Sequence, residues 1–171
     1  MQGKATLADH PIHPMLVGFP IGFFGAVLVS DVISIWGNPA FWPHMSLWLI
    51  AFGVIGALLA AVFGFVDYFT APMSAPAKRT ATTHMVLNLI VVAFYVAAFF
   101  VRYNNPISTL GYVLTYIGLG ILVVSGWYGG HLVYVGLVGT KPAQETTVEG
   151  RVSETMRAPA ERRAPFPGRW A

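Results

Sequence analysis

The 25 residues from Met45 to Phe69, MSLWLIAFGVIGALLAAVFGFVDYF, decide the fold. They contain a single charged side chain, Asp67, which lies close to the end of the run. A helix that crosses the hydrocarbon core of a bilayer needs roughly 20 mainly apolar residues. This segment therefore predicts a transmembrane helix, and it indicates an integral membrane protein.

Three further segments have the same character, at about residues 15–36, 81–102 and 108–129. The four spans occupy most of residues 1–140, and 56% of the 171-residue chain is hydrophobic against 10% charged. Short turns join the spans, so we expect an all-α, antiparallel bundle of four transmembrane helices. Five of its ten Lys and Arg residues flank the spans, which argues for membrane topology and against nucleic acid as a partner.

The distribution of basic residues predicts the orientation. Lys4, Lys78, Arg79 and Lys141 fall at the end of the bundle that holds the N-terminus, which we call face A; Arg102 falls at the opposite end, face B. Loops on the cytoplasmic side are enriched in Lys and Arg. We therefore expect a multi-pass protein of the bacterial inner membrane with both termini in the cytoplasm.

The character of the chain changes after residue 140. Residues 141–171 are rich in Pro, Arg and Glu and have no apolar periodicity. A segment of this composition does not bury enough apolar surface to fold alone. We expect this tail to be extended or disordered unless a partner orders it.

One ion pair is predicted at face B. Asp31 lies 18 residues after His13, which corresponds to about 27 Å along a helix, and this places it level with Arg102. An isolated charge inside a membrane is costly and is usually paired. An ion pair between Asp31 and Arg102 is therefore expected, with a structural role.

The histidines are the main candidates for function. Threading the spans through a bilayer brings His10, His13, His84 and His131 to face A, whereas His44 falls at face B. Imidazole is a common ligand for metals and haem and carries protons near neutral pH. Because helix ends of an antiparallel bundle meet at one depth, we expect the four histidines at face A to converge.

Two polar side chains should face this cluster. Asp67 lies three residues after Gly64, on the same helix face as a stripe of small residues. Such stripes mark the contacts between helices in membranes. Asn88 lies one helical turn after His84, and Tyr95 continues the same line. These positions predict that all three polar groups point into the bundle.

The first functional hypothesis is an electron-transfer subunit that binds b-type haem. The candidate haem-binding residues are His10, His13, His84, His131 and Asn88. A non-haem iron, copper or zinc site is the close variant, with His13, His84, His131 and Asp67 as candidate ligands. The chain has no cysteine, which excludes thiolate ligands and ordinary iron–sulfur ligation. Catalysis by this chain alone is not expected.

Two alternatives remain open. A cofactor-free accessory subunit would dock a partner through the bundle and the tail, with the histidines forming a hydrogen-bonded plug. A small transporter or proton path would use His84, Asn88 and Tyr95. We rank the transporter lowest, because no broken pair of helices and no repeated half is evident in the sequence.

Several motifs carry a resemblance to a known family. They are His10-Pro11-x-x-Pro14 with Phe19-Pro20-Ile21, Gly64-x-x-Asp67, Arg79 with His84 and Asn88, and Gly129-Gly130-His131-Leu132-Val133-Tyr134. Over about residues 8–140 the chain resembles the bacterial membrane family catalogued as domain of unknown function 2231. Members are sometimes fused to Rieske-type or cytochrome c domains, so the resemblance implies a redox setting and a redox protein partner. Some members carry another histidine after the Leu-Val-Tyr triplet, where this chain has Gly136 and Leu137.

Overall fold

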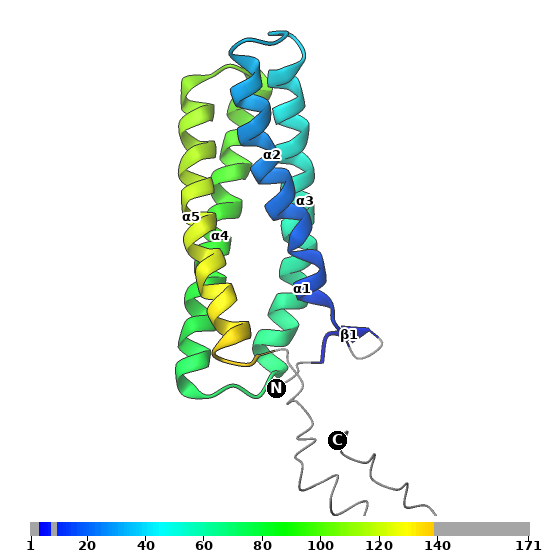
Figure 1. Cartoon of the computed structure of the whole chain (residues 1–171), viewed down its shortest axis with the longest axis vertical. Helices are drawn as coiled ribbons and strands as arrows, with labels where there is room; N and C mark the ends of the chain where they lie inside the picture. Colours follow the sequence, from blue (N-terminus) through cyan, green and yellow to red (C-terminus); the bar gives the residue numbers. More distant parts are fainter. Residues whose placement is uncertain (1–3, 8–9, 139–171) are drawn as a thin grey trace, which may run out of the picture. The chain divides into compact units, whose positions relative to one another are not determined.

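The computed structural model describes residues 4–7 and 10–138, and most of them are helical (Figure 1). The helices are α1 (Ile12–Leu16), α2 (Gly18–Ser34), α3 (Trp42–Thr70), α4 (Ala75–Asn104) and α5 (Thr109–Tyr134). Within the described residues, α1 together with α2, and α3, α4 and α5 each alone, are long and apolar enough to cross a membrane. The expected four-span, all-α membrane protein is therefore confirmed. The predicted tail, residues 141–171, lies outside the described part.

The first span begins with a short extended segment. Strand β1 (Thr6–Leu7) pairs antiparallel with β2 (His10–Pro11), a feature that the sequence analysis did not predict. A residue before proline favours an extended backbone, and His10, which precedes Pro11, lies in β2. His13 also precedes a proline, Pro14, but it lies inside α1, one residue after the start of that helix.

The other helix ends follow local chemistry. The hydroxyls of Ser74 and Ser108 accept hydrogen bonds from backbone amides of the first turns of α4 and α5, as N-cap residues do. Two helices extend beyond the predicted spans: α4 begins at Ala75 rather than at about residue 81, and α5 continues through Gly129 and Gly130 to Tyr134. Inside a bilayer an unpaired backbone group is costly, so the helical hydrogen bonds persist through paired glycines.

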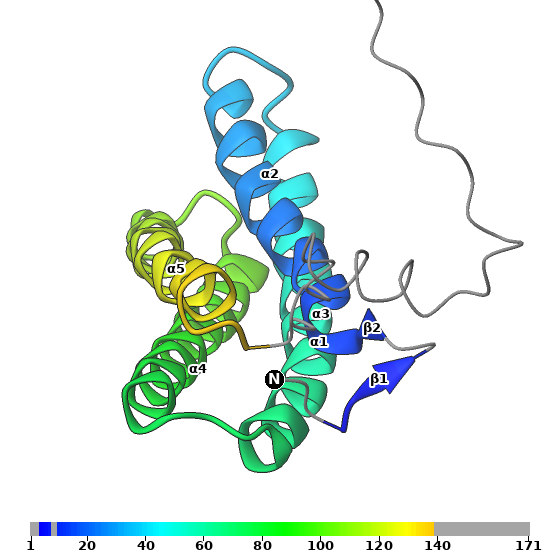
Figure 2. The same cartoon turned by 60° about the horizontal axis from the view of Figure 1, so that its bottom comes forward.

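The helices form two hairpins, α2–α3 and α4–α5, that lie side by side (Figures 1 and 2). Phe24 of α2 and Tyr95 of α4 are buried where the hairpins meet, together with Val27, Ile50 and Val91. Large apolar side chains such as Val123 and Trp127 remain exposed on the outside of the helices, as lipid-facing residues are. The hairpins are thus joined by a small apolar core, and the outside of the bundle suits lipid.

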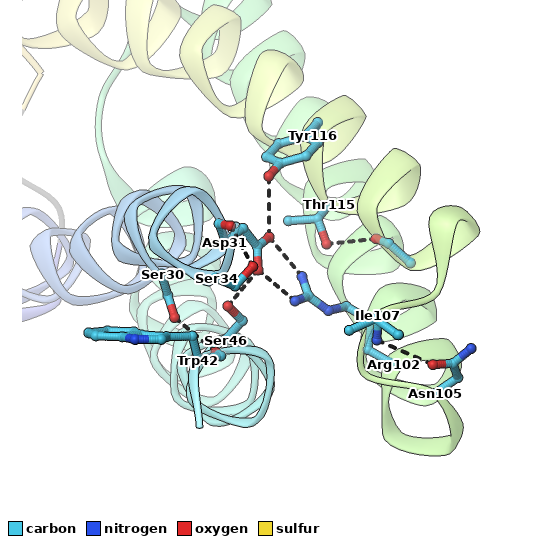
Figure 3. Close-up of polar contacts among 11 residues, drawn as sticks. Ser30, Asp31, Ser34, Trp42, Ser46, Arg102, Asn105, Ile107, Thr115 and Tyr116 are labelled. Atoms are coloured by element: carbon cyan, nitrogen blue, oxygen red, sulfur yellow. Dashed lines mark hydrogen bonds and ion pairs between the residues drawn. The ribbon is translucent and has the colours of Figure 1, made fainter. Parts of the chain in front are cut away.

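The predicted ion pair at face B is confirmed. Arg102 of α4 donates to both carboxylate oxygens of Asp31 on α2, at 2.9 and 2.6 Å, and both side chains are buried (Figure 3). The hydroxyl of Ser46 on α3 donates to the same carboxylate at 2.5 Å, and that of Tyr116 on α5 at 3.4 Å. All four long helices therefore meet at one carboxylate.

Candidate functional site

The two hairpins repeat one pattern of buried positions. Buried residues of α2 and α4 correspond at a separation of 71: Pro20 and Val91, Phe24 and Tyr95, Val27 and Ala98, Asp31 and Arg102. Buried residues of α3 and α5 correspond at a separation of 65: Ser46 and Gly111, Ile50 and Thr115, Gly53 and Gly118, Ala60 and Ser125. Every residue of α5 that is buried has a buried counterpart on α3. The described membrane domain is therefore an internal repeat of one helical hairpin.

The contacts within the hairpins repeat as well. Phe24 packs against Gly53 in the first hairpin, and Tyr95 packs against Gly118 in the second. Both first helices run from face A to face B, so the two halves are repeats with the same orientation across the membrane. The expectation that the sequence has no repeated half, on which the low rank of the transporter partly depended, is therefore wrong. Residues that lie 71 positions apart on the first helices occupy equivalent positions.

His13 occupies the first of two equivalent histidine positions. Its Nδ1 lies 2.8 Å from the carbonyl oxygen of Ala60 on α3. The imidazole lies directly against Gly64, where an added Cβ would come within 2.9 Å of the ring. A glycine at this position is what allows the ring to lie flat against α3.

His84, 71 positions later, repeats the arrangement in the second hairpin. Its Nδ1 lies 2.8 Å from the carbonyl oxygen of Ser125 on α5, and an added Cβ on Gly129 would come within 2.9 Å of its ring. The Ser125 hydroxyl is a further contact of Nδ1, at 3.2 Å. Each histidine ring thus packs against a glycine, and its Nδ1 forms a hydrogen bond with the carbonyl oxygen of the residue four positions before that glycine.

These carbonyl contacts fix the protonation of both rings. A carbonyl oxygen only accepts hydrogen bonds, so Nδ1 must carry the proton in each neutral imidazole. The lone pair then resides on Nε2, the atom that binds metal in many histidine ligands. Nε2 of His84 lies 3.1 Å from the amide nitrogen of Asn88, which donates to that lone pair. Both imidazoles are therefore held with the proton on Nδ1 and the lone pair on Nε2.

Both histidines line one cavity between the hairpins. Its volume is about 430 Å³, and its lining comes from all four spans. The lining is mainly apolar, and small residues such as Gly126 and Ala61 leave open space beside it. Asn88, Asp67, Tyr68 and Tyr134 supply its other polar side chains.

The remaining candidates do not all join this cavity. His10 and His131 are exposed and do not line it, although His131 lies in the last turn of α5, at face A. Asp67 lines the cavity, and its carboxylate accepts the backbone amide of Ala5 at 3.2 Å. His44, which the sequence placed at face B, bonds the carbonyl of Ala40 in the preceding turn.

The predicted four-ligand metal set is not assembled. Among residues 4–7 and 10–138 there is no group of three or more His, Cys, Asp or Glu side chains arranged to hold one metal ion. Of the four histidines expected at face A, only His13 and His84 line the cavity. Asn88 and Tyr95 lie inside the bundle as expected, Asn88 at the cavity and Tyr95 fully buried.

Sequence reasoning missed the glycines and the carbonyls that hold the two rings. Gly64 and Gly129 each belong to a motif that the sequence analysis quotes. The motifs alone do not show that the ring of a histidine on another helix packs against each glycine. Two observations in the sequence point there: each histidine is followed 18 residues later by a charged residue, and the two charges are opposite. That shared spacing is a trace of the repeat.

Comparison with known proteins gives one match. The model of a family described as predicted membrane protein, domain of unknown function 2231, matches residues 9–142. Neither the search of curated proteins nor that of solved structures finds a match. The match spans nearly all of the described helices, including both histidines that line the cavity. The chain therefore belongs to the membrane family of domain of unknown function 2231.

Proposed function

We propose that this protein is a membrane electron-transfer subunit that holds one b-type haem between its two hairpins, with His13 and His84 as the axial ligands. One observation carries the proposal. Two imidazoles from equivalent positions of a repeat line the same cavity, and each has its Nδ1 tied to a carbonyl oxygen. In this arrangement the lone pair of each ring lies on Nε2, where iron could bind; at His84 the iron would have to displace the Asn88 amide.

The number of ligands favours haem over a bare metal ion. A structural zinc site needs four protein ligands, and the cavity supplies two imidazoles. In haem the porphyrin provides the four in-plane donors, so the protein needs to add axial ligands only. A pair of histidines from equivalent positions of the two hairpins, lining one cavity, would meet that requirement.

The cavity also suits a flat apolar group. Its volume of about 430 Å³ lies within the range of about 300–1,000 Å³ that ligand pockets occupy. Pro20, Phe24 and Leu122 are among its apolar lining residues, and Gly126 and Gly130 offer flat surfaces without side chains. When bound, the haem would supply one-electron redox chemistry; the protein would set its potential through burial and the hydrogen bonds to the histidines.

The location that fits this role is the bacterial inner membrane. Of the described basic residues, Lys4, Lys78 and Arg79 lie at face A, and Arg102 at face B is buried in its ion pair. Because cytoplasmic flanks are enriched in Lys and Arg, face A is the cytoplasmic side in our proposal. An electron would then enter or leave through a redox protein partner at that face, where the histidines lie.

A cofactor-free accessory subunit remains the second candidate, and one observation favours it. Nδ1 and Nε2 of His84 both have partners within the protein, Ser125 and Asn88. A histidine satisfied in this way can serve as a structural plug between α4 and α5. On this account replacing His84 would lower stability and would change no spectrum.

The deciding experiment is the visible spectrum of the detergent-purified protein, oxidised and then reduced with dithionite, with iron analysis of the same sample. We expect a Soret band and sharp reduced α and β bands. His13→Ala and His84→Ala should each abolish the low-spin spectrum, whereas His131→Ala, at an exposed histidine of the same face, should retain it. Absence of haem from protein purified under conditions that preserve it would reject the proposal and leave the accessory subunit.

A further inference from the structure

The cavity between the hairpins has the height of one bilayer leaflet. Its lining residues on α4 run from Ala81 to Val92, and those on α5 run from Leu122 to Tyr134. These residues lie mostly in the half of each helix toward face A. Val92 follows Ala81 by 11 positions, which is a rise of about 16 Å along a helix. Half of the hydrocarbon core of a bilayer is about 15 Å, so the cavity is about as tall as one layer of acyl chains.

The cavity is continuous with the lipid-facing surface of the bundle. Ile21 of α2, Leu58 of α3 and Leu89 of α4 all line it, and they are 50%, 53% and 47% exposed. In a membrane, hydrocarbon surrounds the exposed parts of these side chains. An apolar chain can therefore enter the cavity from the side, without passing through water.

The polar side chains of the lining already have partners within the protein. Nδ1 and Nε2 of His84 are bonded to Ser125 and Asn88, and the carboxylate of Asp67 accepts the backbone amide of Ala5. Among the described residues, the lining includes neither Lys nor Arg, and the negative charge of Asp67 would repel a phosphate group. These features favour an uncharged, apolar occupant and exclude a lipid headgroup from the cavity.

We propose that, in the protein without a cofactor, this cavity holds one acyl chain of a phospholipid from the face A leaflet, whose headgroup stays outside the lining. Apolar atoms that face an empty space lose their packing contacts, and an acyl chain restores them. A transmembrane helix of a partner, about 10 Å across with its side chains, is too wide for a volume of about 430 Å³. The acyl chain binds without haem, and haem would have to displace it.

The test is photolabelling of the haem-free full chain in bilayers of a phospholipid that carries a diazirine near the end of one acyl chain. Mass spectrometry then identifies the labelled residues. We expect labels on Phe24 and Val91, which line the cavity although each is 1% exposed, and on Val123 at the outer surface. Tyr95, which is fully buried and does not line the cavity, should carry none. A diazirine on the headgroup should label neither Phe24 nor Val91.

Two substitutions fill the cavity from different helices. Gly126→Phe and Ala61→Phe enlarge small lining residues, and each should abolish labelling of the two buried lining residues while labelling of Val123 persists. The matched control is Gly120→Phe on α5. Gly120, like Gly126, has open space at its Cβ position, but it does not line the cavity, so this variant should be labelled like the wild type.

The outcomes separate the lipid site from the proposed function. Wild-type protein that is labelled at Val123 but not at Phe24 and Val91 would overturn the lipid site. Labels at Phe24 and Val91 that persist in both filled variants, or that also arise from the headgroup probe, would overturn it as well. Protein that shows the expected labels but binds no haem would reject the proposed function and leave the lipid site in place.

Discussion

Phe24 and Tyr95 stack face to face across the boundary between the two hairpins, with ring centroids 3.6 Å apart and planes 10° from parallel. They are equivalent residues of the repeat, and each leans on a glycine of its own hairpin, Gly53 and Gly118. Phe24 lines the cavity, whereas Tyr95 is fully buried behind that lining. The stack therefore joins the halves between the histidines at face A and the ion pair at face B.

The hydroxyl of Tyr95 gives a first prediction. It is buried and has no hydrogen-bond partner among the described residues, and an unsatisfied buried polar group costs about 1–3 kcal/mol. Tyr95→Phe keeps the stacked ring and removes that cost, so the melting temperature of the detergent-solubilised protein should rise. Tyr103→Phe, at a tyrosine that is 67% exposed, is the control and should not change it. A lower melting temperature in Tyr95→Phe would mean that the hydroxyl has a partner, such as a buried water.

The Asp31–Arg102 pair gives a second prediction. Removing one partner of a buried ion pair leaves an unpaired charge and costs about 3–5 kcal/mol. Asp31→Asn and Arg102→Gln should each lower the melting temperature strongly. The double variant leaves no unpaired charge. Its melting temperature should therefore fall by less than the sum of the decreases in Asp31→Asn and Arg102→Gln.

The same variants test whether the pair has a structural role only. If the haem spectrum of the double variant is unchanged, the ion pair acts through the stability of the bundle. Additive losses in the double variant would instead contradict a direct interaction between Asp31 and Arg102, despite their two hydrogen bonds.

The fold was predictable because hydropathy and length are enough to place membrane spans. The ion pair was also predictable, since the rise per residue of a helix puts Asp31 and Arg102 at one depth. Both inferences use position along a helix axis, which sequence spacing gives directly. The end of α5 was not predictable in this way, because a Gly-Gly pair often ends a helix in water, where the freed backbone groups are solvated.

The choice among the histidines depends on the rotation of each helix about its axis, which spacing along the axis does not give. His13 and His84 are distinguished by the glycines beneath them, Gly64 and Gly129, and these lie on other helices. The repeat was concealed because its equivalent charged positions carry opposite signs, Asp31 and Arg102. On the lipid side, moreover, any apolar residue can replace another.

The glycine beneath His84 gives a third prediction. Gly129→Ala would place a Cβ within 2.9 Å of the imidazole, whereas Gly120 has no atom within 4 Å of the equivalent point and does not line the cavity. The ring must move in the first variant, and loss of ligand orientation typically costs about 10–100-fold in affinity. On the proposed haem-binding role, we expect haem affinity to fall by that factor in Gly129→Ala and to be unchanged in Gly120→Ala, measured by titration of the haem-free protein with haemin.

The repeat extends this argument to the first hairpin as a fourth prediction. An added Cβ on Gly64 would also come within 2.9 Å of its histidine, His13, so Gly64→Ala should weaken haem binding to a similar degree. The control is Gly22→Ala, because Gly22 has open space at its Cβ position and does not line the cavity. If Gly64→Ala binds haem as well as the wild type while Gly129→Ala does not, only His84 is a ligand. Equal losses at the two glycines require that each hairpin contribute one histidine, since each glycine contacts the histidine of its own half alone.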